Sequence, residues 1–160
     1  MQPQDFQNLM KSVFDTVAEG AVDQALAGRL NETYPTGSDK VSEIEQACLT
    51  AIDAGWMCAE GAEGRRFGRV IEASSDTHNL SVDVVQLKDI VGPHHIHPTG
   101  EVCLTMPQDA GAKFDGQGAG WCVNDPGSGH FPTVTDGEAL VLYLLPGGEI
   151  NFTGKKPPSD

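Results

Sequence analysis

Three histidines and one glutamate in the middle of the chain have the residue types and the spacing of a metal site. Side chains alternate along an extended chain, so His95 and His97 point to the same face. The Pro-Thr-Gly turn at 98–100 then brings Glu101 back toward the two imidazoles at the start of the next strand. His130 follows a second turn-rich segment, and we expect it to complete the set.

The chemistry of this set favours a divalent metal. Two imidazoles, a carboxylate and a third imidazole suit Mn, Fe, Co, Ni or Zn, and such a set leaves coordination positions for water or substrate. A single histidine in a turn is more often a surface residue. The pattern His-x-His-x3-Glu with a later His makes metal binding the better interpretation. We therefore predict one divalent ion, with Mn, Fe and Zn as the first candidates.

The first third of the chain is predicted to be helical. Apolar residues recur at a helical spacing in three stretches, 6–17, 22–30 and 41–52. Pro35 ends the second helix, because the residue before a proline disfavours the helical region. Ser42 and Glu45 have the spacing of a capping box for the third helix, and Gly55 is expected to end it.

After Arg66 the pattern changes from a helical period to alternation. The expected strands cover residues 67–71, 80–87, 101–106, 120–123, 131–134, 139–145 and 149–152. Short strands at this spacing are typical of an antiparallel sandwich or a small barrel. Helices followed by strands without alternation define the α+β class. We predict a single domain over 1–160, with a helical region at 1–58 and the β-unit at 66–152.

The composition argues against several kinds of partner. Ten Lys and Arg against 23 Asp and Glu give a formal net charge of −13, which disfavours nucleic acids and acidic membrane surfaces. The first residues carry no secretory signal, and the four cysteines form no C-x-x-C pair, so we expect a cytoplasmic protein with free thiols. No G-x-G-x-x-G fingerprint occurs, and no nucleotide cofactor is expected.

Two segments resemble the motifs of the cupin superfamily. Residues 95–101 (His-Ile-His-Pro-Thr-Gly-Glu) are similar to the first motif, in which two histidines and a glutamate bind metal. Residues 126–130 (Pro-Gly-Ser-Gly-His) resemble the second, which supplies the last histidine. Over 66–152 the resemblance implies a small double-stranded β-helix barrel with the metal inside. The chain departs from the motifs in a shorter second segment and in Val134, where Asn is usual.

The whole chain is similar to the 4-hydroxylaminobenzoate lyases of bacterial nitrobenzoate degradation. The likeness lies in the acidic composition, the helices ahead of segment 92–101, and segment 121–130. It implies conversion of 4-hydroxylaminobenzoate to 3,4-dihydroxybenzoate (protocatechuate) and ammonia. It also implies that the metal is held by His95, His97, Glu101 and His130. His94 is then a general acid or base or a support for a ligand, and Glu101 is alternatively the base.

An anionic substrate in an acidic chain requires a local cation. Arg69 lies inside a predicted strand, where an inward charge is costly unless it is paired. We therefore predict that Arg69, and next to it Arg66, binds the substrate carboxylate, since arginine matches a carboxylate in two hydrogen bonds. Trp121 is a candidate for stacking on the aromatic ring, although most tryptophans pack in cores or interfaces.

Other functions are open at this point. The same ligands would serve a dioxygenase or an isomerase acting on a small aromatic or polar substrate. A cupin without catalysis would bind a small ligand only, but such modules often lose a metal ligand. The apolar helical stripes also allow a homodimer or another homo-oligomer, with helices packed across a two-fold axis.

Overall fold

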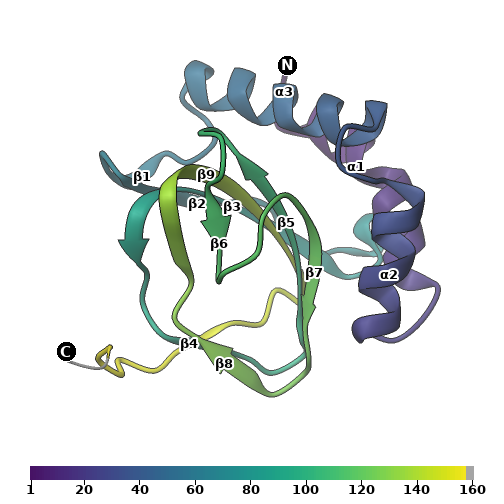
Figure 1. The fold of residues 1–160 in the computed structure, drawn as a ribbon. Coiled ribbons are helices and arrows are strands. Elements are labelled where there is room, and N and C mark those ends of the chain that lie inside the picture. The colour runs from purple at the N-terminus through teal and green to yellow at the C-terminus, as the bar shows by residue number, and fades with distance from the viewer. Residues whose placement is uncertain (158–160) are drawn as a thin grey trace.

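The computed structural model describes residues 1–157 and places three helices ahead of the strands (Figure 1). The helices are α1 (Pro3–Ala18), α2 (Gln24–Thr33) and α3 (Asp39–Ala54). The strands are β1 (Glu60–Ala62), β2 (Arg65–Ile71), β3 (Leu80–Val91), β4 (His95–His97), β5 (Glu101–Pro107), β6 (Lys113–Phe114), β7 (Gly120–Asn124), β8 (Ser128–His130), β9 (Thr133–Pro146) and β10 (Asn151–Phe152). This order confirms the predicted α+β class. Within 1–157, no helix is long and apolar enough to cross a membrane.

The start of α3 differs from the prediction. The capping box expected at Ser42 and Glu45 is wrong, because the helix begins a turn earlier. Ser38 precedes the first turn, and its side chain accepts a hydrogen bond from the backbone N–H of Val41 at 3.4 Å. The predicted end is confirmed: Gly55 caps the helix with a φ of 89°, a conformation that glycine adopts readily.

Two antiparallel sheets build the β-unit. The larger runs in the order β1-β2-β3-β9-β5-β7, with β6 paired to β9, and the smaller in the order β10-β4-β8. Figure 1 shows the large sheet curving, with β4 and β8 below it and the helices outside. The two sheets together form the predicted small barrel, and the small sheet carries most of the predicted metal ligands.

Strand β9 joins two runs that the sequence separates. Two strands were expected at 131–134 and 139–145, and this expectation is wrong because one continuous strand covers both. The Asp136-Gly137 step between them has φ values of 62° and 124° and forms an irregularity within the strand instead of a turn. The neighbouring strand β3 shifts its register after Lys88, at the same level of the sheet.

Alternation along β9 separates two cores. Leu142 and Leu144 point to the helices and pack with residues such as Phe6 of α1. Val141 and Tyr143 point the other way, into the barrel. Strands β3 and β5 follow the same alternation, so the large sheet has one face for the helices and one for the site.

The apolar stripes of the helices are covered by the chain's own sheet. Met10 and Val13 of α1, Leu26 of α2 and Ile44 of α3 are fully buried in the core that this sheet shares. These stripes are therefore used within one chain, and they lend no support to a dimer contact. The predicted homo-oligomer stays a prediction.

Candidate metal centre

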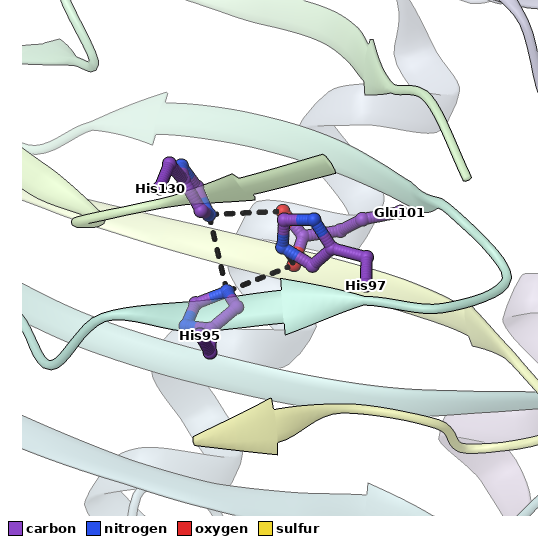
Figure 2. Close-up of side chains that lie close together, drawn as sticks. All are labelled: His95, His97, Glu101 and His130. Atoms are coloured by element: carbon purple, nitrogen blue, oxygen red, sulfur yellow. Dashed lines mark hydrogen bonds and ion pairs between the residues drawn. The ribbon is translucent and has the colours of Figure 1, made fainter. Parts of the chain in front are cut away.

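The four predicted ligands come together inside the barrel. His95 and His97 both lie on β4, Glu101 begins β5, and His130 ends β8. Strand β8 pairs with β4 so that His130 stands directly opposite His95. Figure 2 shows the four side chains pointing toward one another. His95, His97 and Glu101 are buried, and the side chain of His130 is 16% exposed.

The turn between the two ligand strands depends on a glycine. Gly100 has a φ of 89°, and a Cβ at this position would lie 2.8 Å from Cγ1 of Val22 and 3.2 Å from the carbonyl oxygen of Asn124. The backbone carbonyl of His97 accepts hydrogen bonds from the N–H of Gly100 at 3.2 Å and of Gly127 at 2.7 Å. These bonds tie the two motif turns together, so the turns position the ligands relative to one another.

The separations of the donor atoms fit one metal ion. Nε2 of His97 lies 2.8 Å and Nε2 of His95 lies 3.4 Å from Oε2 of Glu101. Nε2 of His130 lies 3.1 Å from Nε2 of His95 and 3.7 Å from Oε1 of Glu101. One donor atom from each residue lies within 4.8 Å of the others. An ion with bonds of about 2.1 Å holds adjacent donors roughly 3.0 to 3.4 Å apart.

Two of these buried atoms have no hydrogen-bond partner among the described residues. Nε2 of His97 and Oε2 of Glu101 lie 2.8 Å apart, yet the pair lacks hydrogen-bond geometry. Leaving buried polar atoms unsatisfied is costly, so such atoms call for an explanation. Donor atoms aimed at a common point instead of at each other are what a metal requires, and the residues present therefore fit a divalent ion.

The neighbouring side chains keep the carboxyl group of Glu101 ionised. Burial by itself raises the pKa of this carboxyl group. The imidazoles of His95 and His97 and the thiol of Cys103 outweigh burial and hold the pKa of Glu101 well below its usual range. Glu101 is therefore a carboxylate at neutral pH, which is the state that coordinates a metal.

Each imidazole is oriented through its second ring nitrogen. Nδ1 of His130 lies 2.5 Å from Oδ2 of Asp115. The corresponding nitrogen of His97 lies 3.4 Å from the hydroxyl of Ser128, and that of His95 lies 3.3 Å from the carbonyl of Pro93. Metal-binding histidines usually make such bonds, which fix the ring and leave Nε2 free for the metal.

The carboxylate is supported in the same way. Oε1 of Glu101 accepts hydrogen bonds from Nδ2 of Asn124 at 3.0 Å and from Sγ of Cys103 at 2.9 Å. Asp115, Asn124 and this use of Cys103 were not predicted from the sequence. The contact of Cys103 could have been predicted, because it lies two residues from Glu101 and its side chain therefore points to the same face of the strand. Asp115 could not have been found in this way, because only the fold brings it from the end of β6 into contact with His130.

Removing the Asp115 carboxylate is expected to weaken the metal site without dismantling it. The variant Asp115→Ala should lower metal affinity by about 10- to 100-fold, because His130 loses the acceptor that orients its ring. Titration of the metal-free variant with a competing chelator measures this change. Asp53→Ala, at an exposed position of α3, is the matched control and should bind as the wild type does. Equal affinities in both variants would contradict the role of Asp115.

A cavity of about 310 Å³ opens beside the four clustered side chains. Its volume is at the lower end of the range for small-molecule sites, about 300 to 1,000 Å³. His95 forms part of the wall, and most of the rest is apolar, including Phe67 and Leu87. Tyr143 also lines the cavity, and burial raises the pKa of its hydroxyl well above the usual value, so this group stays protonated.

The other predicted site residues lie in different places. Arg69 lines the cavity. His94 is half-buried, and its Nδ1 lies 2.7 Å from the hydroxyl of Thr153. Arg66 lies on β2 next to cavity-lining residues but is not one of them, and Trp121 donates from Nε1 to the carbonyl of Tyr34 at 3.0 Å. The roles predicted for these four residues stay predictions, and only Arg69 faces the cavity.

A barrel of antiparallel strands that gathers three imidazoles and a carboxylate beside an apolar cavity defines a candidate metal-dependent enzyme of the cupin class. The chain belongs to the 4-hydroxylaminobenzoate lyase family, PnbB, whose family model matches residues 8–152. This match confirms the resemblance found in the sequence.

Two curated relatives carry the same description. The chain is 30% identical over 140 residues to the 4-hydroxylaminobenzoate lyase of Pseudomonas putida, covering 77% of this chain and 80% of the relative. It is 26% identical over 159 residues to the 4-hydroxylaminobenzoate lyase of Nocardioides sp. (strain LMS-CY), covering 94% of each.

Solved structures with a similar chain path include lyase and cupin proteins. The DMSP lyase DddQ from Ruegeria pomeroyi DSS-3 is 20% identical, with a TM-score of 0.48 over 94% of this chain and 96% of that one. An RmlC-like cupin protein from Ralstonia eutropha JMP134 is 10% identical, with a TM-score of 0.43 over 57% of this chain and 62% of that one.

Proposed function

We propose that the protein is a metal-dependent lyase that converts 4-hydroxylaminobenzoate and water to 3,4-dihydroxybenzoate and ammonia. The observation that carries this proposal is the complete set of four buried donors beside a cavity, in a chain of the 4-hydroxylaminobenzoate lyase family. The atoms balance without an external oxidant or reductant. A nucleotide cofactor is therefore not required.

The metal would be held by His95, His97, Glu101 and His130. When bound, a divalent ion supplies Lewis acidity that polarises the hydroxylamine oxygen and eases cleavage of the N–O bond. Asp115 and Asn124 keep His130 and Glu101 aimed at the ion, so the donors need not reorganise during the reaction.

The remaining side chains of the cavity would bind the ring and control protons. Apolar walls at Phe67 and Leu87 suit an aromatic ring and exclude bulk water. Tyr143 lines the same cavity, and its protonated hydroxyl would be a hydrogen-bond donor for the bound substrate. Glu101 acts as a ligand in this proposal, because its Oε2 lies 2.8 Å from Nε2 of His97 and 3.4 Å from Nε2 of His95.

We also propose that the protein works in a reducing compartment, the cytoplasm. All four cysteines are free thiols. Burial raises the pKa of Cys58 to about 12, and it also raises the pKa of Cys48, so these thiols are poor nucleophiles and suit a structural role.

An anaerobic assay tests the function. The metal-loaded protein, incubated with 4-hydroxylaminobenzoate without oxygen, is expected to release ammonia and 3,4-dihydroxybenzoate in equal amounts. A dioxygenase on the same barrel would form no product under these conditions, and a binding protein would form none with or without oxygen. Absence of both products from the metal-loaded protein would overturn the proposal.

A further inference from the structure

Four charged side chains line the cavity: Glu60, Arg65, Arg69 and Asp83. An aromatic carboxylate entering a chain of net charge −13 needs a positive group that is not already neutralised. The candidates are therefore the two arginines, and their partners decide between them.

Arg69 is already occupied. Its Nε and Nη2 donate to the two carboxylate oxygens of Asp83 at 2.8 and 3.2 Å, and Nη2 also donates to the carbonyl of Gly148 at 3.0 Å. In addition, Oε2 of Glu72 lies 3.6 Å from Nη1 of Arg69. Two acidic groups neutralise this guanidinium, and releasing it toward a substrate would break a two-point ion pair. Arg69 therefore acts as a brace between β2, β3 and the turn after β9.

Arg65 is free by comparison. Within residues 1–157 its side chain makes no ion pair and no hydrogen bond. Its guanidinium lies over the ring of Phe67, 5.3 Å from the centroid, which holds the positive group against the cavity wall. Alternation along β2 puts Arg65, Phe67 and Arg69 on the face that looks into the barrel.

The groove that adjoins the cavity at Arg65 is lined by positive side chains. This groove of about 230 Å³ shares Arg65, Gly92 and Pro93 with the cavity. In the described part of the chain, the charged side chains that line this groove are Arg65 and Lys155, without an acidic one. Pro93 lies two residues before His95, so this positive mouth is close in the chain to the metal ligands.

We propose that Arg65 binds the carboxylate of the aromatic substrate at the mouth of the cavity and selects anionic over neutral ring compounds. The inference rests on the proposed function for the identity of the substrate. The ring then lies in the apolar cavity that Arg65 and His95 both line, with its hydroxylamine toward the metal ligands. Lys155 adds positive potential at the entrance.

Binding of unreactive ligands tests this assignment independently of catalysis. Calorimetry with the metal-loaded protein would compare 4-hydroxybenzoate with its neutral amide, 4-hydroxybenzamide. Arg65→Met should raise the dissociation constant for the acid by about 10-fold or more and change that for the amide by less than about twofold. Lys88→Met removes the same charge from the adjacent strand β3, at an exposed position outside the cavity, and should leave both constants unchanged.

These results test the carboxylate-binding role of Arg65 separately from the proposed lyase activity. If Arg65→Met loses selectivity for the acid but the wild type releases no ammonia, the role of Arg65 stands and the proposed lyase activity fails. If the wild type binds acid and amide equally well, the proposal for Arg65 is overturned whether or not the protein is a lyase. A loss of selectivity in Arg69→Met or Arg66→Met, with Arg65→Met unchanged, would overturn it as well.

Discussion

The variant His97→Ala is expected to lose both the metal and the activity. The imidazole is fully buried, and its Nε2 is one of two donor atoms without a hydrogen-bond partner among the described residues. No other side chain is positioned to replace it in the described chain, so occupancy should fall close to zero after dialysis. Loss of the Lewis acid should lower turnover by about a thousandfold or more, since a metal contributes several kcal/mol to such reactions.

Metal analysis and turnover are measured together on the same preparation. His78→Asn serves as the control, because His78 is a partly exposed histidine with a left-handed backbone that asparagine also tolerates. Circular dichroism and thermal melting report whether each variant is folded. A folded His97→Ala protein with unchanged metal content would remove His97 from the ligand set.

The variant Glu101→Gln separates the two roles that the sequence left open for this residue. Glutamine preserves the volume and keeps an oxygen for the bonds from Asn124 and Cys103. Its amide nitrogen takes the place of Oε2, the oxygen nearest to His95 and His97, and an amide N–H₂ does not coordinate a metal. Metal affinity should fall by more than about 100-fold, beyond the effect of changing a supporting residue.

Thermal melting with and without metal provides a second measurement. Excess metal should stabilise the wild type, by about 2.7 kcal/mol at a hundred times the dissociation constant, and should barely affect Glu101→Gln. Glu45→Gln, a half-buried glutamate of α3, is the matched control and should respond as the wild type does. If Glu101→Gln keeps its metal but loses activity, Glu101 is a base and not a ligand.

The sequence predicted that His95, His97 and Glu101 lie together, because these three residues are close along the chain. His95 and His97 share a face through strand alternation, and the turn at 98–100 returns Glu101 to them. His130 is farther along the chain, after a second turn-rich segment, and the resemblance to the second cupin motif supported its place in the set. It lies on β8, which pairs directly with β4. The helices were predictable for a similar reason, because one face of each carries the apolar residues of a single core.

The residues that the sequence missed depend on contacts between distant segments. Asp115 lies on a short loop whose place beside His130 is set by the pairing of β6 with β9. The choice of arginine depends on which one finds an acidic partner, and β2 pairs with β3 so that Arg69 stands opposite Asp83. A one-residue shift in that register would turn the side chains of one strand to the other face and remove this pairing.

The most direct test is a titration of the metal-free protein with Mn, Fe or Zn, following turnover of 4-hydroxylaminobenzoate without oxygen. Release of ammonia and 3,4-dihydroxybenzoate is expected to rise in proportion to bound metal and to reach a plateau at one ion per chain, the capacity of one four-donor site. Full turnover by the metal-free protein, or no turnover at full occupancy with any of these metals, would contradict this expectation.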